Sequence, residues 1–341
     1  MKLLDLFSGI GGFHLGLEQS GFKFDWVGFS EIDKYASKQY KRRFPNATEL
    51  GNITTVQPKN LPSDITILCG GFPCQAFSIA GKRQGFNDTR GTLFFEIARI
   101  LRYFKDIGKP IPYFVLENVK GLLNHDNGQT FATIYGVLSD LDYTVECQLL
   151  NTKWWLPQNR ERIYIVGHLG ERGRSKIFPI TKGNKKTLIK KVNFKIADYR
   201  NDEGLRIRKD GNSPCLSQAM GTGGQNVPLL INKKYNFSQK SLNKTLEKFN
   251  LNYDDTKALD LYNKKAQDIC PTLTEPHHNC LRLYNKSTVR KLTPIECERL
   301  QGFPDDWTEG QSDTQRYKQL GNAVSVPVVK AVGDKIIKLI N

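Results

Sequence analysis

The chain has 341 residues and a net charge of +16, from 50 Lys and Arg against 34 Asp and Glu. Hydrophobic residues make up 39% and charged residues 25%, a composition typical of a globular protein and not of a disordered one. No apolar run approaches the roughly 18 residues that a membrane span needs, and the start resembles no signal peptide, which argues against a membrane protein.

Short apolar strands alternate with helical patterns over residues 1–170. The predicted strands are Leu3–Leu6, Trp26–Phe29, Ile65–Cys69, Tyr113–Leu116, Thr144–Leu149 and Arg162–Val166. The predicted helices between them are Gly12–Glu18, Lys34–Arg42, Phe94–Phe104 and Gln129–Leu141. This alternation favours an α/β fold with a parallel, doubly wound sheet, in which ligands bind beyond the carboxyl ends of the strands.

The sequence changes character after Gly170, where it becomes polar and poor in helical periodicity. Residues 171–200 hold ten Lys or Arg and two acids, which is +8 of the net +16. A localised basic stretch favours a nucleic-acid partner because Lys and Arg release counterions from phosphates, although a solvated linker is the alternative. From Leu292 the pattern becomes compact again and ends in a predicted helix over Val326–Ile340. We expect a first domain over 1–184, a loop-rich second domain over 185–293 and a return over 294–341.

The first two strands are followed by residues suited to binding a nucleotide-like ligand. Asp5-Leu-Phe-Ser-Gly-Ile-Gly-Gly runs from a strand into a glycine turn, where a ligand can approach the backbone near a helix start. Glu31 follows the second strand, where an acid can accept hydrogen bonds from both hydroxyls of a ribose. A surface acid at the start of the next helix is the ordinary alternative for Glu31.

A cysteine and a glutamate follow the next two major strands. Cys74 lies in Gly70-Gly-Phe-Pro-Cys-Gln-Ala-Phe-Ser, which has the composition of a loop, and Glu117 ends the strand after it. Because both follow strands that end at one edge of the sheet, they suggest a nucleophile beside a proton donor. Taken alone, Cys74 would be read as an inert cysteine and Glu117 as a helix-capping acid. Arg160 and Arg162 are two positions apart, so their side chains lie on the same face of a strand. There they can hold a phosphate, a carboxylate or a base edge, or simply face solvent.

The seven cysteines form no CxxC pair, which favours reduced thiols in a cytoplasmic protein without a metal site. A zinc module is conceivable in one segment, although its spacing matches no common finger; its members would be Cys270, His277, His278 and Cys280. Near the C-terminus, Thr293 and Pro294 predict a helix start with Thr293 as the N-cap. No physical argument from the sequence gives Asn322 a role.

Together these motifs resemble the cytosine-5 DNA methyltransferases of bacterial restriction–modification systems. The resemblance covers residues 1–168 and 288–341, with motifs in family order at Asp5–Gly12, Gly71–Ser78, Glu117–Val119, Gln158–Arg162, Arg290–Asp305 and Gly321–Val324. It implies a Rossmann-like, S-adenosylmethionine-dependent methyltransferase domain with a smaller target-recognition domain inserted near the C-terminus. Catalysis and cofactor binding would belong to 1–184, DNA recognition to 185–293, and a hinge with a return to the catalytic domain to 294–341.

The resemblance also implies roles for single residues. Those that would line the S-adenosylmethionine pocket are Phe7, Gly9, Gly11, Glu31, Ile32, Asn52, Ile53, Pro73 and Asn322. Those that would act on the base are Cys74 as nucleophile, Glu117 at its N3, and Arg160 and Arg162 as supports. Those that would contact DNA are Gln75, Ser78, Gly223, Gly224 and Gln225. Asn52 stands where the family often has Asp, and its side-chain carbonyl can still accept a hydrogen bond from the adenine amino group.

The implied substrate is a cytosine rotated out of double-stranded DNA, since the reacting atom is hidden inside the base stack. We expect a monomer that acts separately from any cognate restriction endonuclease. Two alternative functions are a methyltransferase of the same fold that acts on tRNA and a protein that binds DNA without catalysis. A tRNA cytosine-5 methyltransferase would have the same fold but usually lacks an insert as large as 185–293. An inactive protein that only binds DNA would need a disrupted catalytic motif, but Cys74, Glu117 and Arg162 are all present.

Overall fold

The computed structural model describes residues 1–73, 93–170, 177–181, 213, 215–216 and 292–340, and the backbone of seven strands between residues 194 and 291. The predictions that lie outside these residues concern Cys74, Gln75, Ser78, Gly223, Gly224, Gln225 and the four residues of the conceivable zinc module.

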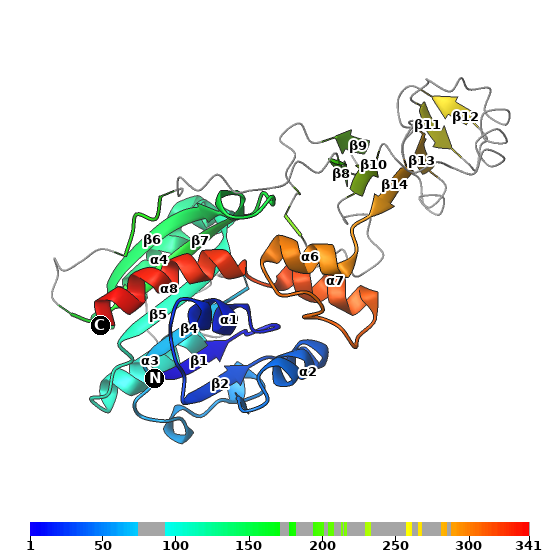
Figure 1. Cartoon of the computed structure of the whole chain (residues 1–341). Helices are drawn as coiled ribbons and strands as arrows, with labels where there is room; N and C mark the ends of the chain where they lie inside the picture. The colour runs from blue at the N-terminus through cyan, green and yellow to red at the C-terminus, as the bar shows by residue number, and fades with distance from the viewer. Residues whose placement is uncertain are drawn as a thin grey trace.

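Seven strands form the central sheet, in the order β3-β2-β1-β4-β5-β7-β6 (Figure 1). Their bounds are Lys2–Leu6 for β1, Trp26–Ser30 for β2, Thr48–Glu49 for β3, Ile67–Gly71 for β4, Tyr113–Val119 for β5, Thr144–Asn151 for β6 and Glu161–His168 for β7. β1 pairs in parallel with both β2 and β4, so the strand order reverses around it. Open α/β sheets bind their ligands at such a reversal, beyond the carboxyl ends of the strands.

The α/β class is confirmed, but the expectation of a wholly parallel sheet is wrong for one strand. β7 runs antiparallel to both of its neighbours, β5 and β6. Residues 152–160, which connect β6 to β7, contain only a short 3-10 turn, Thr152–Trp154. A parallel return requires a crossover of a dozen residues or more, usually through a helix, so this short connection brings the chain back antiparallel.

Helices cover both faces of the sheet, as the alternating pattern predicts. One face carries α1 (Gly12–Gln19), α2 (Lys34–Arg43) and α8 (Val326–Ile340), and the other carries α3 (Leu93–Asp106) and α4 (Gln129–Ser139). Short 3-10 turns lie in the connections, at Ile53–Thr55, Pro58–Asn60, Lys120–Leu123 and His125–Gly128. Among the described residues, none of the helices has the length and apolar character needed to cross a membrane.

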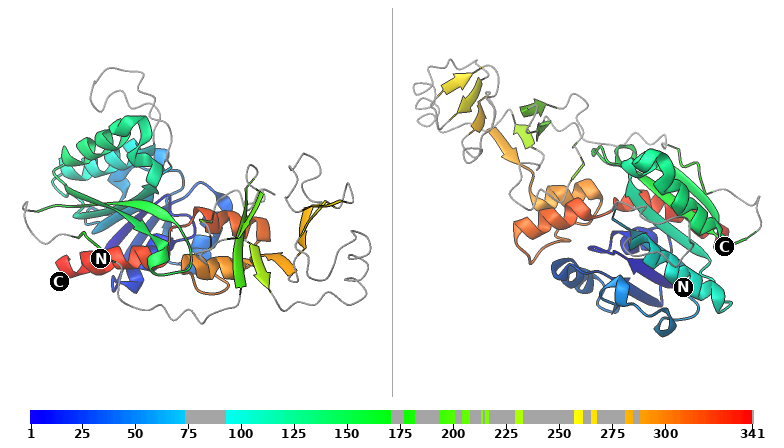
Figure 2. Two further views of the ribbon diagram at one scale, coloured as in Figure 1. Left: turned by 90° about the horizontal axis from the view of Figure 1, so that it is seen from above. Right: turned by 180° about the vertical axis from the view of Figure 1, so that it is seen from behind.

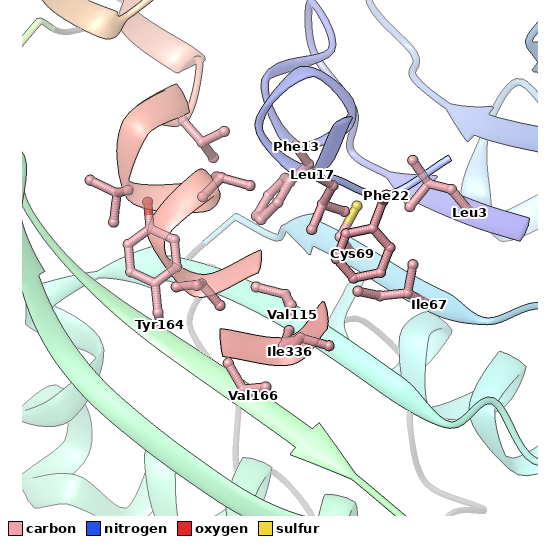
Figure 3. Packing of buried hydrophobic residues seen from close by; sticks show 14 of the residues in the cluster. Leu3, Phe13, Leu17, Phe22, Ile67, Cys69, Val115, Tyr164, Val166 and Ile336 are labelled. Carbon is pink, nitrogen blue, oxygen red and sulfur yellow. The ribbon is translucent and has the colours of Figure 1, made fainter. Parts of the chain in front are cut away.

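Alternate residues of each strand enter two different cores. Leu3 of β1 and Val115 of β5 pack with side chains of α1 and α8, as Figure 3 shows. Their neighbours Leu4 and Phe114 point to the other face and pack with α3 and α4. Because both faces of the sheet are covered, its strands read as nearly continuous apolar runs, which is why they stand out in the sequence.

The C-terminal segment adds two helices beside the sheet, α6 (Pro294–Gln301) and α7 (Asp313–Asn322). The predicted helix start at Thr293 is confirmed: its hydroxyl accepts the backbone N–H of Glu296, whose side chain accepts the N–H of Thr293 in return. This reciprocal pair is a capping box, which satisfies two of the free donors at the start of a helix.

Seven further strands form two small antiparallel sheets, ordered β14-β10-β8-β9 and β12-β11-β13. Their bounds are Phe194–Arg200 for β8, Gly204–Ile207 for β9, Leu229–Asn232 for β10, Lys257–Asp260 for β11, Lys265–Gln267 for β12, Leu281–Tyr284 for β13 and Thr288–Lys291 for β14. Figures 1 and 2 show both sheets beyond α6 and α7, away from the central sheet.

Candidate active site

The glycine turn after β1 bends away from the sheet through left-handed backbone. Phe7, Gly9 and Gly11 have φ angles of 53°, 56° and 85°, and Gly11 is the N-cap of α1. In the described part of the chain, no atom apart from Gly9 and its two neighbours lies within 4 Å of the place that a Cβ on Gly9 would take, so the backbone there faces open space. Nearby, the buried hydroxyl of Ser8 has no hydrogen-bond partner in the described part of the chain. An open backbone turn beside a helix start, with a free polar group, suits a bound polar molecule.

Glu31 lies directly over this turn, as the position after β2 predicts. Its Oε2 accepts the backbone N–H of Gly9 at 2.8 Å, and its Oε1 accepts the N–H of Asp33 at 2.8 Å. The two hydrogen bonds hold the carboxylate at the carboxyl edge of β1 and β2. The next residue, Ile32, is 75% exposed and places an apolar surface beside the acid.

Residues 51–53, the third segment expected to line the pocket, also approach the end of β2. The Ser30 hydroxyl donates to the Gly51 carbonyl at 2.7 Å. Asn52 is exposed, and its side-chain oxygen accepts the N–H of Thr54 at 3.1 Å, which caps the following 3-10 turn. Ile53 is 2% exposed and packs in the core beside α3. The structure therefore gives both residues a local structural role and leaves their expected contacts with a cofactor as predictions.

Glu117 is brought together with both predicted arginines. Its Oε1 lies 3.2 Å from Arg162 Nε and 3.8 Å from Arg160 Nη2, and the carboxylate is nearly buried. Gly71 pairs with Glu117 in the sheet, and a Cβ on Gly71 would stand 3.5 Å from Glu117 Oε2. The acid therefore faces the end of β4, where Phe72 and Pro73 lead directly to Cys74.

Arg160 has more partners than the sequence suggested. It is 3% exposed, and its Nη1 donates to the carbonyls of Leu216 and Gly321, both at 3.2 Å, and to Cys215 Sγ at 3.3 Å. Burial opposes the charged form, but nearby Cys215 and Glu117 outweigh it, and the pKa of Arg160 lies above its usual value. Arg160 therefore stays charged and joins the acid to the turn before Asn322 and to residues 215–216.

Asn118 is a site residue whose role the sequence analysis missed. It is 2% exposed, its amide donates to the Phe72 carbonyl at 2.9 Å, and its side-chain oxygen accepts the N–H of Val119 at 2.8 Å. The side chain thus ties the start of the Cys74 loop to the end of β5. An amide directly after a strand-terminal acid was the available signal, but its partner lies 46 positions away.

The remaining predicted pocket residues are Pro73, which follows β4, and Asn322, which comes two residues before Val324, whose side chain lies 3.9 Å from the place of a Cβ on Gly71. Pro73 is exposed after Phe72, and Asn322 is exposed at the end of α7. Over the described residues, no group of three or more His, Cys, Asp or Glu side chains is arranged to hold a metal ion.

Comparisons with known proteins match nearly the whole chain. Residues 1–338 match the family model for the C-5 cytosine-specific DNA methylases. The Type II methyltransferase M1.ScrFI of Lactococcus lactis subsp. cremoris is 39% identical, over 99% of this chain and 78% of that protein. The Type II methyltransferase M.SsoII of Shigella sonnei is 40% identical, over 100% and 81%. Among solved structures, the S. pombe Dnmt2 methyltransferase has a TM-score of 0.64 at 19% identity, over 100% of this chain and 99% of that one, which supports the fold.

Proposed function

Because the chain belongs to the family of C-5 cytosine-specific DNA methylases, we propose that it methylates carbon 5 of a cytosine within a specific sequence of duplex DNA. One observation supports the proposed site above all. The buried Glu117 carboxylate, held by Arg160 and Arg162, faces the end of β4, which leads to Cys74. β4 lies next to β1, which leads to the glycine turn, and β2, which leads to Glu31, is one strand further.

The residues around the glycine turn fit S-adenosylmethionine as the methyl donor. Over the residues that the structure describes, the open space at Gly9, the unpartnered hydroxyl of Ser8 and the fixed carboxylate of Glu31 suit a polar ligand with ribose hydroxyls. The residues that would hold it are Phe7, Gly9, Gly11, Glu31, Ile32, Asn52, Ile53, Pro73 and Asn322. When bound, S-adenosylmethionine supplies an electrophilic methyl group on a sulfonium sulfur.

The chemistry requires a nucleophile because carbon 5 of cytosine is too weak to attack a sulfonium methyl group. The Cys74 thiolate adds to carbon 6, and the electrons released from the ring double bond make carbon 5 enamine-like and nucleophilic. Glu117, carrying a proton, contacts N3 and gives or shares that proton, which neutralises the negative charge that develops on the ring, while Arg160 and Arg162 hold the carboxyl group in place. After the methyl group is on carbon 5, with S-adenosylhomocysteine as the other product, a base removes the proton from carbon 5. The electrons of that bond re-form the double bond between carbons 5 and 6, and Cys74 leaves carbon 6 as a thiolate.

We assign target recognition to residues 185–293. The support is their polar sequence, the two small sheets away from the central sheet, and the basic stretch at 171–200. The residues proposed to contact the duplex are Gln75, Ser78, Gly223, Gly224 and Gln225. Contacts there would offset the few kcal/mol needed to rotate the cytosine out of the stack.

The Type II relatives favour a role in a restriction–modification system, in which this chain protects DNA from a separate cognate endonuclease. We propose that the protein acts as a cytoplasmic monomer, since one chain supplies both the proposed catalytic groups and the proposed recognition segment.

The test compares Cys74→Ser with Cys147→Ser, which changes an exposed cysteine on β6, two strands from β5 and outside the proposed site. Transfer of tritiated methyl groups to duplex DNA should fall on the order of 10⁴-fold or more in Cys74→Ser, the scale seen when a catalytic nucleophile is removed. Its affinity for S-adenosylmethionine and the activity of Cys147→Ser should remain. Substantial DNA methylation by Cys74→Ser would refute the nucleophile, and methylation of tRNA in place of duplex DNA would refute the substrate.

A further inference from the structure

A long-range ion pair joins two walls of the proposed cofactor site. Lys318 Nζ lies 2.6 Å from Asp33 Oδ2, across 285 positions of sequence. Asp33 comes two residues after Glu31 and caps α2, whereas Lys318 lies in α7, one helical turn before Asn322. The pair thus connects the acid proposed for the ribose to the helix that ends in another proposed cofactor contact.

Asp33 uses each of its polar groups for a different contact. Its Oδ1 accepts the N–H groups of Tyr35 and Ala36 at 2.9 and 3.3 Å, and its Oδ2 accepts from Lys318. Its own backbone N–H donates to Glu31 Oε1 at 2.8 Å, and Glu31 Oε2 accepts from Gly9. Any shift of Asp33 relative to Lys318 would therefore move the hydrogen-bonded carboxylate of Glu31 as well.

The partly buried environment of the ion pair strengthens the attraction between Asp33 and Lys318. The two side chains are 27% and 25% exposed, so solvent screens their attraction less than it screens a fully exposed pair. Burial opposes the charged form of Asp33, but the hydrogen bonds from Lys318 and from the capped N–H groups outweigh it and lower the pKa of Asp33. Asp33 is thus charged at neutral pH.

A second ion pair joins the same two regions but lies far from Glu31. Arg42 Nη2, in the last turn of α2, stands 3.3 Å from Glu309 Oε2 in the segment before α7. Its side chains are 46% and 60% exposed. Arg42 also donates to the backbone carbonyl of Glu309, so Glu309→Gln removes the charge while keeping the attachment. This pair provides a matched control for a general loosening of the two regions.

We propose that Asp33 and Lys318 are positioning residues that hold Glu31 and Asn322 at the separation required to bind S-adenosylmethionine. Neither residue contacts the cofactor in this account; they act through the backbone of the Glu31 loop and through the last turn of α7. The inference rests on the proposed function, because it takes Glu31 and Asn322 as cofactor contacts.

The experiment measures binding of tritiated S-adenosylmethionine by equilibrium dialysis without DNA, and kcat and KM with duplex DNA. The variants are Asp33→Asn, which keeps a good helix cap, Lys318→Met, their combination, Lys318→Arg and Glu309→Gln. Each of the first two should raise Kd and KM for the cofactor about 3- to 10-fold, roughly the contribution of one partly shielded ion pair, with kcat within about twofold. The double variant should be no worse than the poorer single variant, because both remove one interaction.

Lys318→Arg, which keeps the positive charge, should retain most of the affinity for S-adenosylmethionine. Glu309→Gln should bind the cofactor like the unaltered protein. An equal rise in Kd for Glu309→Gln, an unchanged Kd in both single variants, or a fall in kcat at constant KM would each overturn the proposal. The salt dependence gives a second measurement. Raising the NaCl concentration should bring the Kd of the unaltered protein toward that of the double variant, and parallel salt curves for the two proteins would contradict the proposal.

The binding assay keeps this proposal separate from the proposed function. Binding of S-adenosylmethionine without methyl transfer to cytosine would overturn the function and leave the ion-pair test readable. Methyl transfer with unchanged cofactor affinity in both single variants would overturn only the role of the ion pair.

Discussion

The cofactor half and the catalytic half of the proposed site each contain a buried carboxyl group, and they accommodate it in opposite ways. Beneath the glycine turn, Asp5 is fully buried and accepts from Tyr40 Oη at 3.2 Å and Cys69 Sγ at 3.4 Å. Burial raises the pKa of Asp5 to about 8, so the group is mainly protonated at neutral pH. In the catalytic half, Glu117 lies within ion-pair distance of Arg160 and Arg162.

The difference indicates what each half is built to do. The cofactor half keeps Asp5 mainly uncharged beneath the glycine turn and fixes Glu31 through backbone N–H groups. Its residues should therefore govern the affinity for S-adenosylmethionine. The catalytic half keeps guanidinium groups against an acid where charge develops on a base, so its residues should govern turnover. Substitutions on the two sides should therefore separate binding from kcat.

The largest effect expected from this contrast belongs to Glu117→Gln. The amide keeps the shape of the side chain but cannot neutralise the ring through a proton, so kcat should fall about 10²- to 10⁴-fold, the range for general acid–base groups. The Kd for S-adenosylmethionine should stay within about threefold. Glu161→Gln, which changes a partly exposed acid at the start of β7, is the control. A normal kcat for Glu117→Gln would remove the acid from the mechanism.

Glu31→Gln should show the reverse behaviour. It replaces charge-assisted hydrogen bonds, worth about 1.5–3 kcal/mol each, so the cofactor Kd should rise roughly 10- to 100-fold while kcat at saturation changes little. Equilibrium dialysis and initial rates measured on one preparation would check both numbers. If kcat fell and the Kd stayed the same, the division between the two halves would be wrong.

A smaller effect concerns stability and Asp5. A carboxyl group whose pKa rises from 3.8 to about 8 on folding contributes stability that is complete below pH 3.8 and is lost as the pH rises through about 8. Asp5→Asn cannot ionise, so its free energy of unfolding should depend less on pH between 4 and 8. Urea midpoints at pH 5 and pH 8 would measure this, and identical pH dependence in both proteins would show that Asp5 does not carry the effect.

The sequence predicted those parts of the site that depend on short stretches of chain. The glycine turn and Glu31 follow apolar strands directly, and the paired strands bring them to one edge. The direction of β7 was not predicted, because it depends on a connection that lacks a helix. The resemblance assigned Glu117, Arg160 and Arg162 to one site without predicting contacts among them, and the structure brings the three within ion-pair distance.

The contacts that could not be predicted join segments that are distant in sequence. Arg160 donates to Leu216 and to Gly321, which lie 56 and 161 positions away, and Asn118 donates to Phe72. Such partners are set by how the sheet and α7 pack together, and no local spacing encodes them. The recognition residues Gly223, Gly224 and Gln225 stay predictions, since they lie outside the described residues.

The central claim is that the thiol of Cys74 bonds to carbon 6 of the target base, and mechanism-based trapping tests it most directly. Duplex DNA carrying 5-fluorocytosine should form a denaturation-stable adduct with the protein when S-adenosylmethionine is present, because fluorine cannot leave as a proton does. Peptide mapping should place the adduct on Cys74. Normal methylation of ordinary duplex DNA without any such adduct, or an adduct on another residue, would contradict the account.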